Sequence, residues 1–209
     1  PLSNDTSSEF GTITSCNNQD ICWVEGLLST IYDVFLDQIV DGQIYTKGTG
    51  ERDPAREHWT RLHELNLAQN ALLVFDRGYY SKELYEDLVS DGCHVLMRLN
   101  KGNHLTRLGS DDFSWTAAST DGKPVLYRVV RVPMPEQSNE EAEYLVTNIT
   151  DPSISPALLY NLYFERWNIE TKYRELKEWW ELEEFTGTSC NSIEQELYIN
   201  LLFSNLAAL

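Results

Sequence analysis

The chain has 209 residues, 42% apolar and 11% aromatic, so it can bury the core of one full domain, or of one domain that carries an insertion. Its formal charge of −17 counts against nucleic-acid binding, which usually leaves a basic footprint, unless the basic contacts are local or lie on missing segments. No apolar run approaches the about 20 residues of a membrane helix, and the polar start lacks the basic region of a signal peptide.

The first residues read as a polar loop up to position 22. Residues 27–35 and 38–45 are rich in β-branched and aromatic side chains, so they predict a strand pair with Asp37 in the turn. Residues 52–67 carry apolar side chains at helical spacing and predict a helix. Near its start, the Asp53-Pro54 pair fits an N-cap followed by proline at the first helical position.

A strand–helix–strand unit follows. The apolar run from Ala71 to Phe75 is typical of a strand buried on both faces. Ser81 is suited to cap a helix over residues 82–90, and residues 93–99 form the next apolar run. This order predicts a βαβ unit with a parallel strand pair.

Residues 101–146 predict a β-rich insertion of short, turn-rich strands. Asp121-Gly122 is a hairpin signal before the strand at residues 125–130, and a further strand is expected at 144–147. Ser155-Pro156 then predicts the start of a long helix that runs to about Trp180.

A final helix is expected from about Ser192 to the end of the chain. The chain begins with Pro1 and stops at Leu209 inside an apolar stretch, so the sequence predicts a fragment. Its four cysteines and four histidines form no CxxC, HxH or HExxH pattern, which argues against a zinc site. Cys93 is expected to be a core thiol, and the cysteine usage predicts a reduced, cytoplasmic setting.

Four polar side chains of the long helix attract attention: Tyr163, Arg166, Glu170 and Lys177. At about 100° per residue they fall within an arc of about 60° on an unbroken α-helix, so they form one stripe. A carboxylate can hold a metal ion, and the flanking cations can hold phosphate. The stripe therefore suggests phosphodiester chemistry.

Asp76 stands at the carboxyl end of the buried strand and before a glycine turn. Open α/β folds place ligands and catalytic groups at this position. The plainer interpretation is an aspartate that caps the strand end or pairs with Arg77.

These residues carry a resemblance to a known family. Tyr163, Arg166, Glu170 and Lys177 match the Y-R-E-K signature of the insertion-sequence-four family of bacterial DDE transposases, and Asp76-Arg77-Gly78-Tyr79 resembles the second-acid motif of the same family. The resemblance implies that Asp76 and Glu170 are the second and third catalytic, metal-binding acids. It also implies that Tyr163, Arg166 and Lys177 contact DNA.

The resemblance implies an α/β, RNase H-like mixed sheet flanked by helices. Residues 1–100 would be the first part of the catalytic core, 101–146 the β-rich insertion and 147–209 the C-terminal helices with the Y-R-E-K helix. The first core strand and the first acid of the family would precede Pro1. Asp41-Gly42 superficially resembles the missing motif, but it maps to a later strand, so Asp41 is not assigned a catalytic role.

The function implied by the resemblance is that of a DNA transposase, with endonuclease and strand-transfer steps. Two Mg²⁺ or Mn²⁺ ions would act on transposon ends and target DNA. The protein would self-associate on DNA in the bacterial cytoplasm, without contact to a membrane. A fragment that lacks the first acid would be inactive alone.

Plainer alternatives remain beside each assignment. Glu170 could be an exposed glutamate that pairs with Arg166 or Arg174, Tyr163 a core residue and Lys177 a solvated one. Trp179 and Trp180 are expected to pack in the core, although stacking on a base is the alternative. The whole chain could be a disabled transposase relic, a nuclease with the same fold, or an acidic interaction domain.

Overall fold

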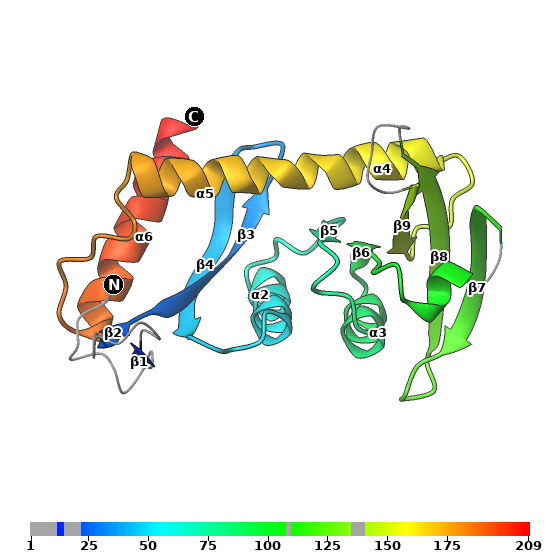
Figure 1. Cartoon of the computed structure of the whole chain (residues 1–209), viewed down its shortest axis with the longest axis horizontal. Coiled ribbons are helices and arrows are strands. Elements are labelled where there is room, and N and C mark those ends of the chain that lie inside the picture. Colours follow the sequence, from blue (N-terminus) through cyan, green and yellow to red (C-terminus); the bar gives the residue numbers. More distant parts are fainter. Residues whose placement is uncertain (1–11, 15–21, 108–109, 135–140) are drawn as a thin grey trace. The chain divides into compact units, whose positions relative to one another are not determined.

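The computed structural model describes residues 12–14, 22–107, 110–134 and 141–209 (Figure 1). The chain divides into two compact units. We call Pro1–Arg61 with Trp167–Leu209 the hairpin unit, and Leu62–Arg166 the sheet unit.

The hairpin unit is built on two long antiparallel strands, β3 (Gly26–Asp33) and β4 (Gln38–Thr46). The turn between them contains Asp37 at a φ of 55°, and the Asp33 carboxylate accepts two backbone N–H groups of the turn. The predicted strand pair is therefore confirmed.

A second, short strand pair corrects one expectation. Strand β1 (Thr12–Thr14) pairs antiparallel with β2 (Cys22–Val24), so the stretch predicted as a loop contains a strand. Backbone hydrogen bonding to a partner about ten residues away decides this, and the polar composition does not reveal it. The rest of that stretch lies outside the described residues.

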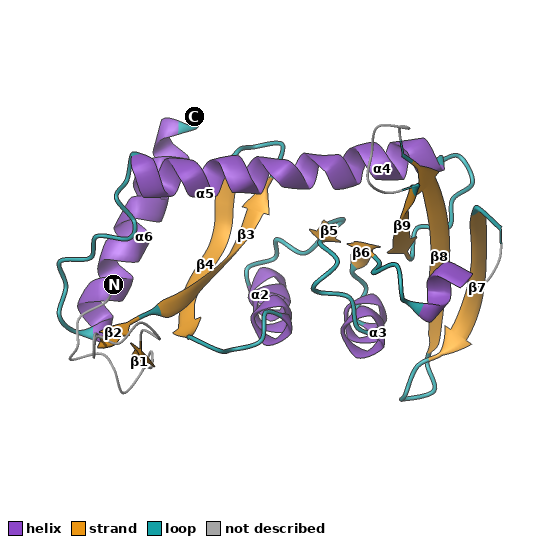
Figure 2. Ribbon diagram, in the orientation of Figure 1, coloured by secondary structure: helices purple, strands orange, loops and turns teal. Residues whose placement is uncertain are grey.

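The helices of the hairpin unit cover the strand pair. α2 (Arg52–Glu64) starts in this unit, and α5 (Asn168–Glu178) and α6 (Cys190–Ala207) complete it (Figure 2). The core of the unit joins β4, α5, α6 and the loop before α6 through five buried apolar side chains: Ile39, Leu176, Leu182, Leu197 and Leu201.

Two helix boundaries differ from the sequence prediction. α2 begins at Arg52 as predicted but ends at Glu64 instead of residue 67, and Pro54 occupies the third helical position and not the first. α6 begins at Cys190, because Ser189 forms a capping box with Ser192 and thereby fixes the start two residues earlier than expected.

The sheet unit contains one five-stranded mixed sheet. Its strand order is β5 (Leu72–Phe75), β6 (His94–Arg98), β9 (Ala142–Thr147), β8 (Pro124–Pro133) and β7 (Asp112–Ala118). β5 and β6 run parallel, and the remaining neighbours are antiparallel. The strands expected in the insertion thus continue the sheet of the βαβ unit. The boundaries at residues 100 and 146 stay a prediction.

Two helices flank this sheet on opposite faces (Figure 1). α3 (Lys82–Ser90) is capped by Ser81, and α4 (Pro156–Phe164) is capped by Ser155, both as predicted. α4 contributes Leu159 and Tyr163 to a buried cluster, in which they pack against the strand residues Leu96, Val130 and Leu145. The prediction of an α/β, RNase H-like mixed sheet flanked by helices is confirmed.

The long helix expected from Ser155 to Trp180 is interrupted. A 3-10 turn, η3 (Glu165–Trp167), separates α4 from α5. Residues of a 3-10 turn advance by about 120° each, so the angles calculated for one unbroken α-helix do not hold across this turn. The stripe of Tyr163, Arg166, Glu170 and Lys177 therefore stays a prediction.

Candidate active site

Asp76 directly follows β5, the strand at one edge of the five-stranded sheet. Period-two alternation places its side chain on the same face as Leu72 and Val74, which pack against the α4 cluster. The side chain is 39% exposed. Asp76 is thus a half-open carboxylate at the carboxyl end of a strand, beside the helix that carries Tyr163.

Two hydrogen bonds converge on one oxygen of Asp76. The backbone N–H of Arg77 donates to Oδ1 at 2.7 Å, and the Tyr163 hydroxyl donates to the same atom at 2.8 Å. The Arg166 guanidinium lies 4.0 Å from Oδ2. The structure therefore brings Asp76, Tyr163 and Arg166 together.

The electrostatics keep Asp76 ionised. Burial alone would raise the pKa of its carboxyl, but the hydrogen bonds from Arg77 and Tyr163 and the charges of Arg166 and Arg98 outweigh burial and lower that pKa. Asp76 is consequently a carboxylate throughout the neutral range, which is the form that binds a metal ion.

Tyr163 serves both the core and the polar site. Its ring is 2% exposed and packs with Leu96 and Leu159, as the core interpretation holds. Burial and the hydrogen bond to Asp76 raise the pKa of its hydroxyl to about 12, so the hydroxyl remains a donor at neutral pH. The Arg166 guanidinium carbon lies 5.5 Å from the centre of the same ring, within cation–π range.

Glu170 and Lys177 belong to the hairpin unit. Glu170 is exposed in the first turn of α5, where an acidic side chain also complements the helix dipole. Lys177 forms a 2.7 Å ion pair with Glu183, and both side chains are more than half exposed. The roles predicted for Glu170 and Lys177 stay predictions.

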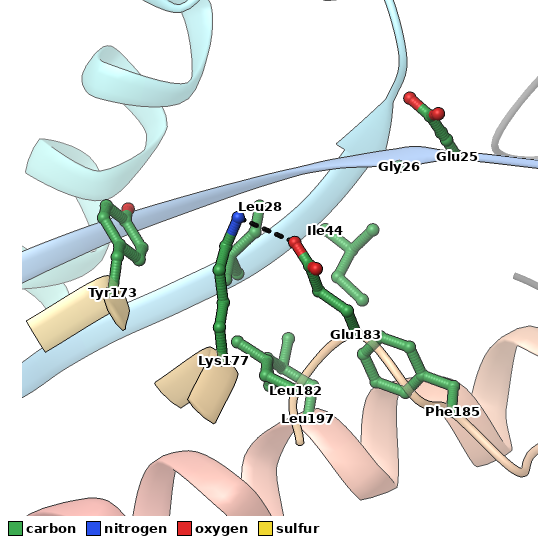
Figure 3. Close-up of a pocket in the computed structure, with 10 residues that line it drawn as sticks. All are labelled: Glu25, Gly26, Leu28, Ile44, Tyr173, Lys177, Leu182, Glu183, Phe185 and Leu197. Carbon is green, nitrogen blue, oxygen red and sulfur yellow. Dashed lines mark ion pairs between the residues drawn. The ribbon is translucent and has the colours of Figure 1, made fainter. Parts of the chain in front are cut away.

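Lys177 also borders a pocket of about 570 Å³ in the hairpin unit (Figure 3). In the figure its ammonium group points to the Glu183 carboxylate. The remaining lining residues combine one acid and one tyrosine with an apolar wall: Glu25, Gly26, Leu28, Ile44, Tyr173, Leu182, Phe185 and Leu197.

The two neighbouring tryptophans behave differently. Trp180 stacks on Phe203 with a centroid distance of 6.1 Å and packs against the core of the hairpin unit, as predicted. Trp179 is 73% exposed, so the prediction that it packs in the core is wrong. Trp179 is the C-cap residue of α5, so it stands where the helix ends.

Asp41 takes part in a separate polar network of the hairpin unit. Its Oδ2 lies 2.5 Å from His58 Nδ1 and 2.6 Å from Arg61 Nε. His58 Nε2 contacts the Ser29 hydroxyl at 3.0 Å. This network ties α2 to the strand pair.

Two charged residues near Asp76 escaped the sequence analysis. Arg98 ends β6, the strand parallel to β5, and Glu143 lies in β9. Their side chains form a 2.7 Å ion pair and are 12% and 11% exposed. Arg98 could have been found, because the carboxyl ends of adjacent parallel strands meet at one edge of a sheet, whereas nothing in the sequence pointed to Glu143.

The chemistry of the donors suits a hard divalent cation. An ionised carboxylate such as Asp76 is the ligand type that Mg²⁺ and Mn²⁺ prefer. Within the part of the chain that the structure describes, no three His, Cys, Asp or Glu side chains gather as a metal-binding group. Asp76 by itself has the chemistry of a single ligand for such an ion.

Two comparisons with known proteins bear on this arrangement. A family model described as the transposase DDE domain matches residues 7–206. The transposase InsG of insertion sequence element IS4 from Escherichia coli (strain K12) is 29% identical over 154 residues, which cover 66% of this chain and 34% of that protein. The chain thus spans about a third of the length of this relative. None of the described helices is long and apolar enough to cross a membrane.

Proposed function

This chain belongs to the transposase DDE domain family, and we propose that it supplies carboxylates for metal-dependent nicking and strand transfer of DNA. The observation that supports this most strongly is the site of Asp76. There the second-acid motif meets Tyr163 and Arg166 of the Y-R-E-K motif through a 2.8 Å hydrogen bond and a 4.0 Å ion pair.

Each residue of the proposed site has a separate role. Asp76 and Glu170 each provide a metal-binding carboxylate. Tyr163 holds the Asp76 side chain in one orientation by donating to Oδ1, which leaves Oδ2 directed toward Arg166. Arg166 and Lys177 bind DNA phosphates, Arg166 through a planar fork of donors and Lys177 as a point charge.

Members of this family generally use divalent metal ions. When bound, Mg²⁺ or Mn²⁺ supplies activation of the attacking oxygen and stabilisation of the leaving oxygen. The residues of this chain contribute the carboxylates and the cations that hold the phosphate. The low pKa of Asp76 means that no proton has to leave before a metal ion binds at neutral pH.

The proposed partners follow from this chemistry. The substrates are the transposon ends and the target DNA, and a chain with a formal charge of −17 must contact them through local cations. Self-association on DNA would bring two ends together. The site of action is where bacterial DNA lies, in the cytoplasm.

The proposal is tested with the natural full-length protein and a duplex that carries the end of its element. Asp76→Ala and Glu170→Ala should each abolish nicking in Mg²⁺. A suitable control is Glu178→Ala, which removes an exposed glutamate two turns further along α5. Normal nicking by either site variant refutes the assignment.

A second substrate separates the proposed function from its two alternatives. Joining of the nicked end to target DNA distinguishes a transposase from a nuclease that only cuts. A wild-type protein that binds and cuts nothing in Mg²⁺ or Mn²⁺ would instead favour a disabled relic.

A further inference from the structure

Arg98 is placed beside Asp76 by the register of two parallel strands. Phe75 pairs with Met97, so the next residue of each strand, Asp76 and Arg98, stand side by side where the strands end. Leu96 belongs to the cluster under α4, and period-two alternation puts Arg98 on that same face. Arg98 and Asp76 therefore face α4 together.

Glu143 reaches Arg98 from the neighbouring antiparallel strand. Arg98 pairs with Leu145, which is buried under α4, and Glu143 lies two residues before it on the same face. Arg98 Nη2 lies 2.7 Å from Glu143 Oε1. With side-chain exposures of only 12% and 11%, this pair is enclosed and ordered in a way that surface pairs are not.

The positive charge of Arg98 changes the pKa values of residues in the candidate active site. It lowers the pKa of Asp76, and it partly offsets the rise in the pKa of Tyr163 that burial produces. At Tyr160, one helical turn before Tyr163, the charge of Glu143 raises the pKa of the hydroxyl and the charge of Arg98 lowers it. An arginine has five donors in a fork, so one guanidinium can hold a carboxylate and a phosphate oxygen together.

We propose that Glu143 is a positioning residue, which acts through Arg98 to present a guanidinium to a DNA phosphate beside Asp76. This inference rests on the proposed function. The competing view is that the pair only stabilises the sheet, as the bidentate pair of Arg128 with Asp112 does.

The test is DNA binding without divalent metal, in EDTA, measured as a function of salt. The natural full-length protein and a duplex of its element's end are used, with Glu143→Ala, Glu143→Gln, Arg98→Ala and the double variant Arg98→Ala with Glu143→Ala. Asp112→Ala is the matched control, because it also removes the acidic partner of a strand arginine. Thermal melting of every variant reports folding separately.

We expect Arg98→Ala to weaken binding about tenfold and to reduce the slope of log K against log salt by about 0.9, the value for one phosphate contact. Glu143→Ala should weaken DNA binding about threefold or more, although it makes the protein less negative. The reason is that Arg98 loses its orientation and with it the charge-assisted contact to the phosphate. Glu143→Gln retains an acceptor for Arg98 and should restore part of the affinity. In the Arg98→Ala background, Glu143→Ala should cause no further loss of DNA affinity.

If the only effect of these variants were to remove the negative charge of Glu143, they would bind DNA more tightly than wild type. If Glu143→Ala and Glu143→Gln bind DNA equally well or more tightly than wild type, the proposal is wrong. A loss by Asp112→Ala as large as that by Glu143→Ala would also overturn it, since the effect would then be structural. Failure of the wild-type protein to bind DNA would refute the proposed function as well, whereas wild-type binding with normal Glu143 variants refutes only this inference.

Discussion

Asp41 of the hairpin unit and Asp76 of the sheet unit are both partly enclosed carboxylates with a lowered pKa. For each, burial raises the pKa, and donors and cations outweigh burial. Their surroundings nevertheless differ. Asp41 is 10% exposed and is held at 2.5 and 2.6 Å by His58 and Arg61, whereas Asp76 is 39% exposed with its nearest cation at 4.0 Å.

This difference separates a structural carboxylate from a candidate ligand. Oδ2 of Asp41 is engaged by His58 and Arg61 inside one unit, where the residue fastens α2 to β4. The hydrogen bonds of Asp76 converge on Oδ1 from neighbouring groups that also orient it. A lowered pKa alone therefore does not identify a functional acid, because ion-pair networks produce the same shift.

The largest expected effect is on catalysis by Asp76. Asp76→Asn in the natural full-length protein should reduce Mg²⁺-dependent nicking by about a thousandfold or more, since a metal-binding carboxylate supports several kcal/mol of transition-state stabilisation. Gel assays of end cleavage measure this. Asp41→Asn, assayed below its melting temperature, should retain nicking, and an equal loss in both variants would remove the distinction.

For stability, we expect the larger effect from Asp41 and the smaller effect from Asp76. Asp41→Ala should lower the free energy of unfolding by about 3 kcal/mol, because it leaves the buried His58 and the Arg61 guanidinium without their common partner. Asp76→Ala should change stability far less, since that side chain is half open. Urea denaturation of both variants tests the contrast, which equal unfolding energies would contradict.

The contribution of Asp41 should also depend on pH. Its folded-state pKa is lowered, so its stabilisation is fully present above the unfolded value of about 3.9 and is lost as the pH falls through the folded value. The stability difference between wild type and Asp41→Asn should therefore shrink below about pH 4. A difference that stays constant from pH 7 to pH 3 would argue against an ionised Asp41 as the source.

A smaller effect is expected from Tyr163→Phe. The change removes the hydroxyl that donates to Asp76 Oδ1, so the pKa of Asp76 should rise toward its ordinary value. An NMR titration of the Asp76 carboxyl carbon measures this shift, and the acid limb of the nicking profile should move to higher pH. Tyr160→Phe serves as the control on the same helix, because the Tyr160 hydroxyl contacts Met134 and not Asp76.

The smallest effect concerns Lys177 and Glu183. Both side chains are more than half exposed, so Glu183→Gln should change stability by less than about 1 kcal/mol. If Lys177 binds phosphate, the same variant should tighten DNA binding slightly at low salt, because its cation is no longer neutralised. Thermal melting and salt-dependent binding measure these two quantities, and weaker binding would argue against the role of Lys177.

Local sequence signals predicted the elements that local interactions determine. Ser81 and Ser155 cap the expected helices, and the Asp121-Gly122 turn joins the expected strands, with Gly122 at a φ of 78°. The apolar run before Asp76 forms the parallel edge strand that brings this acid to the end of the sheet. Such features depend on a few neighbouring residues and can be read directly.

Features that join distant segments could not be predicted in the same way. The tie from Asp41 to His58 and the ion pair from Arg98 to Glu143 each connect different elements, and no spacing rule relates their members. The 3-10 turn at Glu165–Trp167 could not be predicted from the helical pattern either, because no proline or glycine marks this change of backbone geometry in the sequence.

The most direct test of the central claim replaces Asp76 and, separately, Glu170 by cysteine in the natural full-length protein. Mg²⁺ rejects a thiolate ligand, whereas Mn²⁺ tolerates one better. The account predicts that Asp76→Cys and Glu170→Cys fail to nick DNA in Mg²⁺ and regain nicking in Mn²⁺, while the alanine variants stay inactive with both ions. Nicking by the cysteine variants at the wild-type rate in Mg²⁺ would contradict a metal-binding role for these two acids.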